Sequence, residues 1–345
     1  MITKFTARKA DCLLDTELAL TPFHALIGPN DSGKTTILRG LLALASASSR
    51  PLDEALGRDF TFGEGATVTG CTAAGNYVLQ RAEAGVEESW VRPQHVEMGR
   101  PRAYHRLHPS SPAGNLPWIH DVAKMIGTAA LVDFDPPALR AASSLLPDSS
   151  HSDFLALRGA GLPGIYDSIN NRGDDAFRKI SERLSALFPA VKRLRLNTVS
   201  PSQKEIMVEL KSGELVGAAH VSEGILYFLA YTSLLYIRPV SMLLIEEPET
   251  GLHPARIAEV IRTLRAVSES GVQIVLATHS PLVVGEMKPE EVSIVTRTVE
   301  LGTKAVCIKD TPHFEERAKV MALGEIWLNY SDGIEEAGLI KGTVP

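Results

Sequence analysis

The sequence has few cysteines and no long apolar run, and both absences limit what the protein can be. Its three cysteines, Cys12, Cys71 and Cys307, are scattered and form no CxxC pair, which argues against a disulfide framework or a zinc site. No window reaches the roughly 18 continuous apolar residues of a membrane span. The first residues also lack the apolar core of a secretion signal. We therefore expect a cytoplasmic protein without membrane contact.

A positive charge balance is also missing. The chain carries 35 Lys and Arg against 41 Asp and Glu, a net charge of −6, whereas many nucleic-acid-binding modules are strongly basic. Basic residues gather only locally, in two clusters: Arg92, Arg100, Arg102 and Arg106, and Lys192, Arg193 and Arg195. Solvated faces are the favoured interpretation of these clusters, and a local nucleic-acid patch is the alternative.

The length of 345 residues, 44% of them hydrophobic, suits one large domain or two lobes. Frequent prolines in residues 93–173 argue against a long coiled coil there. The spacing of apolar residues predicts antiparallel strands in 60–92, an amphipathic helix over Asp174–Phe188 and a last helix over His313–Leu328. A closing hairpin is expected at 292–296 and 304–308.

The most informative stretch is Gly28–Thr36, which reads Gly-Pro-Asn-Asp-Ser-Gly-Lys-Thr-Thr and fits G-x-x-x-x-G-K-[ST]. A short apolar strand, Phe23–Ile27, precedes it, and apolar residues at helical spacing follow it. This is the strand–loop–helix context in which backbone N–H groups and a helix N-terminus bind phosphates. In such a loop Lys34 can reach the β- and γ-phosphates, and Thr35 offers a hydroxyl to Mg²⁺.

Two later strands end in polar residues. The apolar run Met242–Ile245 leads directly into Glu246 and Glu247, and the run Val272–Ala277 leads into Thr278 and His279. Adjacent carboxylates at the end of a buried strand are costly unless they meet water or a cation. In a phosphate-loop protein they are expected to order Mg²⁺ and to activate water. Because the next strand ends at the same edge of a parallel sheet, His279 is a candidate for contact with the γ-phosphate.

A further short segment, Ser222-Glu223-Gly224, begins an apolar helix that extends to about Tyr236. Ser222 is a favourable N-cap residue for this helix. As local structure this is an ordinary helix start, and its place between the phosphate loop and the acidic strand end makes it notable.

Taken together, these four segments resemble the ABC-type ATPase heads of the RecF, SMC and OLD group. The resemblance is greatest to compact bacterial OLD- and RecF-like AAA-family ATPases without a nuclease domain, and the late segment Gly324–Leu328 is also similar to that group. Ile225 departs from the Thr that usually follows the signature glycine, and the glutamine that often completes the Mg²⁺ shell is not identified. Gln80 and Gln94 are candidates for it.

The resemblance implies a role for each motif residue. Lys34, Glu247 and His279 would be catalytic, with Glu247 polarising the attacking water, and Thr35 and Glu246 would hold Mg²⁺. Ser222 and Gly224 would contact the γ-phosphate of ATP bound by another protomer. The nucleotide-binding residues would be Gly28, Pro29, Asn30, Asp31, Ser32, Gly33, Lys34, Thr35 and Thr36 together with Ser222 and Gly224.

The expected fold is α/β: a P-loop NTPase of the ABC-ATPase head type, with a mixed β-sheet core and a helical or irregular second lobe. Residues 1–92 and 237–345 would form the ATPase lobe. Residues 93–236 would form the second lobe, which contains the signature Ser222–Gly224.

The expected activity is slow, regulated hydrolysis of Mg-ATP by a homodimer that forms head to tail around ATP. Such a dimer would control a separate effector protein, a nuclease or toxin, in bacterial phage defence. The alternative is a RecF-like DNA-binding ATPase in DNA repair or maintenance, and DNA therefore stays open as a partner. A third alternative is an ATP-gated protein-binding switch with very slow hydrolysis.

Overall fold

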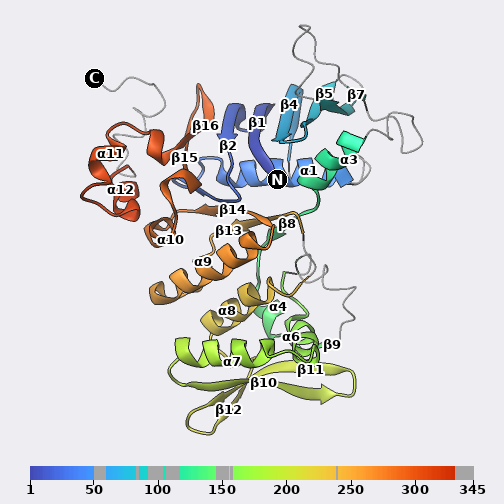
Figure 1. The fold of residues 1–345 in the computed structure, drawn as a ribbon, viewed down its shortest axis with the longest axis vertical. Helices are drawn as coiled ribbons and strands as arrows, with labels where there is room; N and C mark the ends of the chain where they lie inside the picture. Colours follow the sequence, from blue (N-terminus) through green and yellow to red (C-terminus); the bar gives the residue numbers. More distant parts are fainter. Residues whose placement is uncertain are drawn as a thin grey trace. The chain divides into compact units, whose positions relative to one another are not determined.

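The computed structural model describes residues 1–49, 60–82, 85–91, 104–105, 117–144, 155, 158–237 and 240–330. The chain divides into two compact units (Figure 1). Unit 1 comprises Met1–Ala130, Val240–Glu247 and Gly271–Pro345, and unit 2 comprises Leu131–Pro239 and Pro248–Ser270. The lobe boundaries expected at residues 92 and 236 stay predictions. No helix within the described ranges is long and apolar enough to span a membrane.

The structure contains two six-stranded sheets, and all of their strands except β8 lie wholly in unit 1. The first is antiparallel and has the order β2 (Leu13–Ala19), β1 (Ile2–Ala10), β4 (Phe62–Thr72), β5 (Asn76–Ala82), β6 (Gly85–Val91) and β7 (Tyr104–His105). The second has the order β16 (Gly302–Cys307), β15 (Val292–Thr298), β3 (Phe23–Ile27), β14 (Gln273–Thr278), β13 (Met242–Glu246) and β8 (Ala129–Val132). The predicted mixed sheet in an α/β fold is confirmed.

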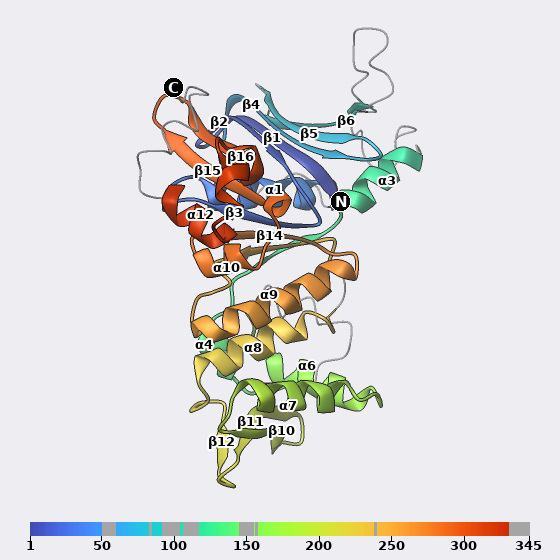
Figure 2. The same cartoon turned by 60° about the vertical axis from the view of Figure 1, so that its left-hand side comes forward.

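Helix α1 (Lys34–Ser49) packs between these two sheets (Figures 1 and 2). Ile37, Leu38, Leu41 and Leu44 are fully buried along it, as the helical spacing of the sequence predicts. The other helices of unit 1 are α3 (Pro117–Ile126), α10 (Pro281–Gly285), α11 (Phe314–Arg317) and α12 (Leu323–Tyr330), with 3₁₀ turns η4 (Pro289–Glu291) and η5 (Ile308–Asp310).

The register of the second sheet determines where its strands end. Strands β15, β3, β14 and β13 are parallel neighbours. Ile27 at the end of β3 is paired with Thr278 at the end of β14, and Ala277 is paired with Glu246 at the end of β13. All residues of β3 and β14 are buried, which is typical of parallel strands covered on both faces. The carboxyl ends of three consecutive strands therefore meet at one edge.

The apolar strand β3 contains one buried imidazole that the sequence pattern did not single out. His24 is almost fully buried, with Nε2 3.0 Å from Ser293 Oγ and Nδ1 3.1 Å from Thr21 Oγ1. Burial lowers the pKa of His24 to about 4, although the negative charge of Glu291 acts in the opposite direction. The neutral ring thus satisfies its hydrogen bonds inside the sheet.

The single last helix predicted over His313–Leu328 is wrong. The chain instead forms two short helices, α11 and α12, separated by a turn. The carboxylate of Glu325 accepts a hydrogen bond from the amide of Ala322 at 2.9 Å, so it caps a new helix start inside the predicted one. Apolar residues continue at helical spacing across the turn. For this reason the sequence pattern alone did not reveal that the helix is interrupted.

Unit 2 is built around helix α8 (Glu223–Ser233), whose residues Ile225–Ser233 are all buried. It packs against α4 (Pro136–Arg140), α6 (Leu162–Asn171) and α9 (Pro254–Glu269). The Tyr166 hydroxyl donates to the carbonyl oxygen of Leu229 at 2.9 Å. Arg183 of α7 (Ala176–Leu187) bonds Glu259 and Thr263 of α9 and so ties these two helices together.

A small antiparallel sheet completes unit 2. It has the order β10 (Val191–Ser200), β11 (Gln203–Leu210) and β12 (Leu215–Gly217), and β9 (Ser143–Ser144) also pairs with β11. Glu209 on β11 is only 8% exposed and forms ion pairs of 2.7 Å with Lys192, Arg193 and Arg195 of β10. Hydrogen bonds from Lys192 and Arg193 lower the pKa of Glu209 to about 2. Lys192, Arg193 and Arg195, one of the two basic clusters in the sequence, therefore surround a carboxylate. The other cluster, Arg92, Arg100, Arg102 and Arg106, lies outside the described residues.

His24 makes the stability of unit 1 depend on pH. Unfolded histidine binds a proton below its ordinary pKa of 6.5, but folded His24 stays neutral to about pH 4. The free energy of unfolding should therefore fall by about 3 kcal/mol as the pH drops through this window. The change can be measured by urea unfolding of the wild type and of His24→Gln at several pH values. The variant keeps a polar side chain but does not titrate. A difference between the two proteins that stays constant from pH 7 to pH 4.5 would contradict it.

Candidate functional site

The segment Gly28–Thr36 leads from the end of β3 into the first residues of α1, as the sequence predicts, and two of its residues must be glycine. A Cβ at position 28 would lie 2.1 Å from the carbonyl oxygen of Val295. Gly33 has φ +101°, and a Cβ there would lie 2.3 Å from Thr303 Oγ1. Strands β15 and β16 therefore press on the loop from one side and fix its backbone.

Lys34 lies at the first position of α1, and its side chain reaches back over the loop. Its Nζ donates hydrogen bonds to the carbonyl oxygens of Gly28 at 2.8 Å and Pro29 at 2.7 Å. Asn30, Asp31 and Thr35 are exposed on the loop. The ammonium group and the N-terminus of a long helix thus lie together, which gives the loop a positive end suited to an anion.

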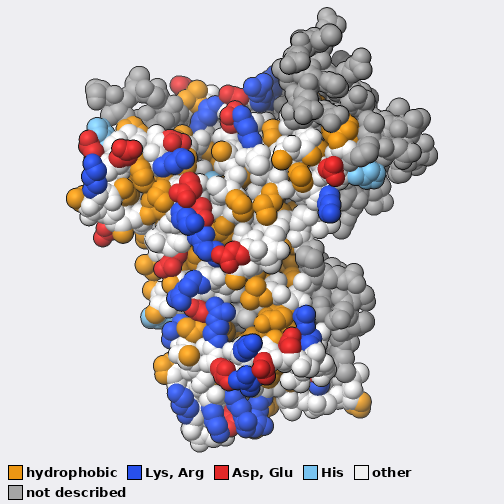
Figure 3. Space-filling model, in the orientation of Figure 1, with side chains coloured by type: hydrophobic (Ala, Val, Ile, Leu, Met, Phe, Trp, Pro, Cys, Tyr) orange, Lys and Arg blue, Asp and Glu red, His pale blue; other side chains and the backbone are white. Residues whose placement is uncertain are grey.

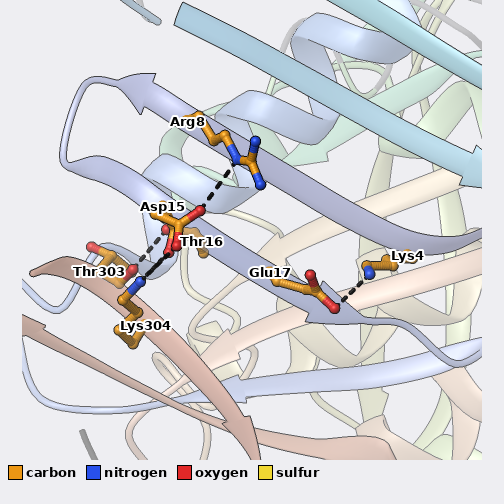
Figure 4. A network of polar contacts seen from close by, with 7 residues as sticks. All are labelled: Lys4, Arg8, Asp15, Thr16, Glu17, Thr303 and Lys304. Carbon is orange, nitrogen blue, oxygen red and sulfur yellow. Dashed lines mark hydrogen bonds and ion pairs between the residues drawn. The ribbon is translucent and has the colours of Figure 1, made fainter. Parts of the chain in front are cut away.

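Thr303 of β16 supports the loop from behind. Its hydroxyl donates to the carbonyl oxygen of Ser32 at 3.0 Å, and Cys12 Sγ lies 3.4 Å from the hydroxyl oxygens of both Thr303 and Thr36. Thr303 is itself held by β2, because the Thr16 hydroxyl donates a hydrogen bond to the carbonyl oxygen of Thr303 at 2.7 Å (Figure 4). The β1–β2 hairpin and β16 therefore hold the loop as one assembly.

Ion pairs strengthen the same assembly. Asp15 on β2 pairs with Arg8 of β1 and with Lys304 of β16, each at 3.3 Å (Figure 4). A hydrogen bond from Lys304 is the largest of the effects that lower the pKa of Asp15. A surface hollow of about 530 Å³ lies where this hairpin, the loop and the β15–β16 turn meet. It is large enough to take part of a small ligand.

The acidic strand end is formed by two carboxylates in different environments. Glu246 ends β13 and is half-buried, and its Oε1 is buried without a hydrogen-bond partner. Glu247 is about half exposed and adopts φ +44°, a left-handed conformation that is uncommon for a residue with a side chain. Its amide donates to the carbonyl oxygen of Ala277 at 2.7 Å, which fixes this turn against β14. A buried, unpartnered carboxylate oxygen costs a few kcal/mol unless a cation or donor meets it.

His279 lies directly beside this carboxylate, because β13 and β14 are neighbours. The distance between His279 Nδ1 and Glu247 Oε1 is 3.4 Å. Thr278 is fully buried, and its hydroxyl accepts a hydrogen bond from the amide of Ser280 at 2.9 Å. Trp327 of α12 donates from Nε1 to the carbonyl oxygen of His279 at 3.3 Å. Hydrogen bonds therefore hold the backbone around His279 on both sides.

The predicted signature Ser222–Gly224 lies in unit 2, at the start of α8. Ser222 is the N-cap residue of the helix, as expected, but its side chain makes no capping hydrogen bond. Ser222 and Glu223 are exposed. Arg140 supports the segment by donating to the carbonyl oxygen of Val221 at 3.3 Å and lying 3.8 Å from Glu223. The segment therefore presents a hydroxyl and a helix N-terminus to solvent.

The site in unit 1 thus combines the phosphate loop, Glu246 and Glu247, and Thr278 and His279 at one sheet edge. Gln80 lies in the antiparallel sheet, on the exposed part of β5, and not in the mixed sheet that carries these residues. Gln94 lies outside the described residues. The roles assigned to the individual site residues stay predictions.

Sequence reasoning did not find the residues that hold this site in place. Thr303 and Cys12 support the loop, Trp327 supports His279, and Arg140 supports the signature. Each of them is distant in sequence from the residue it contacts. The only sequence signal was the segment Gly324–Leu328, which contains Trp327 and was noted only as similar to a family.

Comparison with solved structures shows the fold. The chain is similar to an SMC head bound to the C-winged helix domain of ScpA, with a TM-score of 0.60 and 15% identity over 88% of this chain and 97% of that one. It is also similar to an Smc head domain with an extended coiled coil bound to the C-terminal domain of ScpA derived from Pyrococcus furiosus. That match has a TM-score of 0.52 and 15% identity, and covers 92% of this chain and 99% of that one.

Comparison with sequences gives one family and no individual relative. No curated protein matches the chain. Residues 94–285, more than half of the chain, match the family model described as "AAA domain, putative AbiEii toxin, Type IV TA system". The match contains the signature, the acidic strand end and His279, and the phosphate loop at residues 28–36 lies before it. The chain belongs to this AAA-domain family, and its fold is that of the ABC-type P-loop ATPase heads of the RecF and SMC group.

Proposed function

We propose that the chain binds Mg-ATP at the carboxyl edge of β3, β14 and β13 and hydrolyses it. The observation that carries this proposal is the register of these strands, which brings a phosphate loop, two carboxylates and a histidine to one edge. Ligands of open α/β sheets bind at this edge, beyond the carboxyl ends of the strands.

The phosphate loop fits a triphosphate in its shape and in its charge. Gly28 and Gly33 leave the loop without the Cβ atoms that would strike β15 and β16. The ammonium of Lys34, now bonded to two loop carbonyls, is placed to exchange one of them for a phosphate oxygen. Backbone N–H groups at the start of α1 would add further donors.

The residues at the edge also fit Mg²⁺. Glu246 offers the buried, unpartnered Oε1, and Thr35 offers an exposed hydroxyl at the start of α1. Mg²⁺ is commonly held by one or two such protein oxygens together with phosphate oxygens and water. When bound, the ion supplies positive charge that offsets charge on the phosphates during transfer.

Glu247 and His279 are assigned to the reacting end of the nucleotide. Glu247 is exposed, and its backbone conformation is fixed by a bond to β14. In the proposed reaction its carboxylate accepts a proton from the water that attacks the γ-phosphate. His279 donates a hydrogen bond to a γ-phosphate oxygen, and its distance of 3.4 Å from Glu247 supports a shared task.

The second part of this proposal concerns the signature Ser222–Gly224 at the start of α8. Ser222 and Gly224 contact the γ-phosphate of ATP bound by another copy of the chain, so that two copies form a head-to-tail homodimer around ATP. The exposed hydroxyl and helix N-terminus of this segment support that role. ATP binding then favours the dimer, and hydrolysis releases it.

The ATP-dependent dimer is further proposed to control a separate effector protein, a nuclease or toxin, in bacterial phage defence. The toxin–antitoxin system named in the family description supports a regulatory pairing. The SMC heads of similar fold are bound to ScpA, another protein, which supports a partner on this fold. A RecF-like role on DNA has less support, because the chain carries a net charge of −6.

Replacing Lys34 with Ala should lower ATP turnover at least about a hundredfold, because the charge that meets the phosphates is removed. Phosphate release from purified protein with Mg-ATP measures this change. Lys179→Ala, which removes an exposed lysine from α7, is the matched control and should leave turnover unchanged. Equal turnover by Lys34→Ala and the wild type would refute the site assignment.

Replacing Glu247 with Gln should stop hydrolysis while Mg-ATP stays bound, and should therefore trap the dimer. Light scattering after size exclusion should show the mass double when Mg-ATP is added. Adding Ser222→Arg to this variant should abolish the doubling without preventing ATP binding, because the bulky cation blocks the partner's nucleotide. If the mass of Glu247→Gln is the same with and without Mg-ATP, the composite site is wrong.

Replacing Trp327 with Phe should lower kcat severalfold and leave KM for ATP unchanged, because the donor to the His279 carbonyl is lost but the packing is kept. Steady-state kinetics separates the two constants. Tyr330→Phe on the same helix is the control, since the Tyr330 hydroxyl contacts Thr311 and Pro312, not His279. An equal loss of kcat in both variants would show that α12 acts only through stability.

A further inference from the structure

We propose that Arg140 enables the start of α8 to bind a phosphate of ATP held by another copy of the chain, because it holds the carboxylate of Glu223 away from the helix end. The inference rests on the composite site proposed above and adds a residue to it. Arg140 is the last residue of α4, which packs against α8 (Figures 1 and 2). It is a positioning residue, since it acts on the phosphate through Glu223.

Glu223 creates the need for such a residue. It is the first residue of α8, and its side chain is about half exposed. A carboxylate in the first turn interacts favourably with the positive end of a helix, so it competes with a phosphate for that end. Its negative charge also repels the phosphate. The predicted signature therefore contains a charge that opposes the binding of its ligand.

Arg140 is placed to offset this charge. Its Nη2 atom lies 3.8 Å from Glu223 Oε1 and donates a hydrogen bond to the carbonyl oxygen of Val221 at 3.3 Å. The hydrogen bond places the guanidinium next to Ser222, and the ion pair keeps the Glu223 carboxylate on the side of α4. Because the Arg140 side chain is only 25% exposed, water screens this pair less than a pair on the open surface.

Hydrogen bonding within unit 2 does not by itself explain why Arg140 lies here. Its Nε atom is buried and has no hydrogen-bond partner among the described residues. A buried donor without a partner costs free energy, and such groups in folded proteins call for an explanation. A cation that prepares the neighbouring segment for a phosphate supplies that explanation.

Two further carboxylates act on the first turns of α8, those of Asp133 and Asp135. Burial raises the pKa of the Tyr227 hydroxyl on this helix, and the negative charges of Glu223 and of these two residues raise it further. Both have other partners, because Asp133 pairs with Arg158 at 3.0 Å and Asp135 caps the start of α4. Glu223 is therefore the carboxylate that depends on Arg140.

Other cations of unit 2 are engaged elsewhere. Lys and Arg side chains gather over the small sheet at the lower end of Figure 3, where three of them pair with Glu209. Arg256 of α9 lies nearer to the signature, since its guanidinium is 5.1 Å from the ring centroid of Phe188, which lies 3.9 Å from the place of a Cβ at Gly224. Arg256 makes no ion pair in the described part of the chain, so it is a matched comparison for Arg140.

The test follows Mg-ATP-dependent dimerisation of the full chain in the Glu247→Gln background, measured by sedimentation velocity over a range of protein concentrations. Arg140→Gln should weaken the dimer about tenfold, because each dimer loses this cation at two sites. It should leave ATP binding by the separate monomer unchanged, since Arg140 acts on the nucleotide of the other copy. Arg140→Lys keeps the charge and should dimerise nearly as well as Glu247→Gln alone.

Removing the charge of Glu223 separates this role from a purely structural one. With Gln at position 223, Arg140→Gln should cost less than about twofold in dimer affinity, because no carboxylate is left to hold aside. Arg256→Gln should change the affinity by the same factor whether residue 223 is Glu or Gln. If Arg140→Gln costs the same factor in both backgrounds, Arg140 acts only through the Val221 carbonyl and the proposal is overturned.

Mixing of variants shows on which nucleotide Arg140 acts. Dimers of Lys34→Ala with Arg140→Gln contain one site with both residues intact only if Arg140 serves the ATP of the other copy. The mixture should then turn over ATP severalfold faster than either variant alone, as should the reference mixture of Lys34→Ala with Ser222→Arg. Recovery in the reference mixture alone would refute this inference and keep the composite site, whereas recovery in neither would refute both.

Discussion

Three buried parallel strands end at the same edge of one sheet, where the phosphate loop and several polar residues lie, and this constraint organises unit 1. Inside the sheet the strands are mostly apolar, and the buried side chain of His24 in β3 has hydrogen-bond partners. At the edge they must place carboxylates, a histidine and a glycine-rich loop, groups that are costly to bury without partners. The unpartnered oxygen of Glu246 and the left-handed backbone of Glu247 show that this cost is not fully relieved within the described structure. Local strain of this kind is typical of functional sites.

The phosphate loop depends on contacts from outside its own segment. Glycine permits its turns, but Thr303, Cys12 and the backbone of Val295 determine which turns are adopted. Thr303 and Val295 belong to the β15–β16 hairpin, and Cys12 belongs to the turn between β1 and β2. The ion pairs of Asp15 join these two hairpins. The N-terminal and C-terminal parts of the chain thus form one support for a loop that lies between them in sequence.

Unit 2 combines a fully buried helix, α8, with an exposed N-terminus that carries the signature. Its far sheet is different in character, because an edge strand rich in arginine is held by a single nearly buried glutamate. The division of tasks that we propose follows from these features: nucleotide chemistry on unit 1 and contact with a second nucleotide at α8.

The sequence by itself predicted much of the core and supplied the candidate site residues, whose roles stay predictions. Apolar runs and helical spacing predicted β3, α1, β13 and β14, because the burial of an element leaves a local pattern of apolar residues in the sequence. The phosphate-loop motif and the strand-end carboxylates were also visible, since they are short contiguous segments. Tertiary structure alone decided what lies beside them. It showed that the last helix is broken at Ala322, that His24 is buried neutral, and that Thr303 and Trp327 support the site. These features depend on contacts between residues far apart in the chain, and local periodicity carries no information about such contacts.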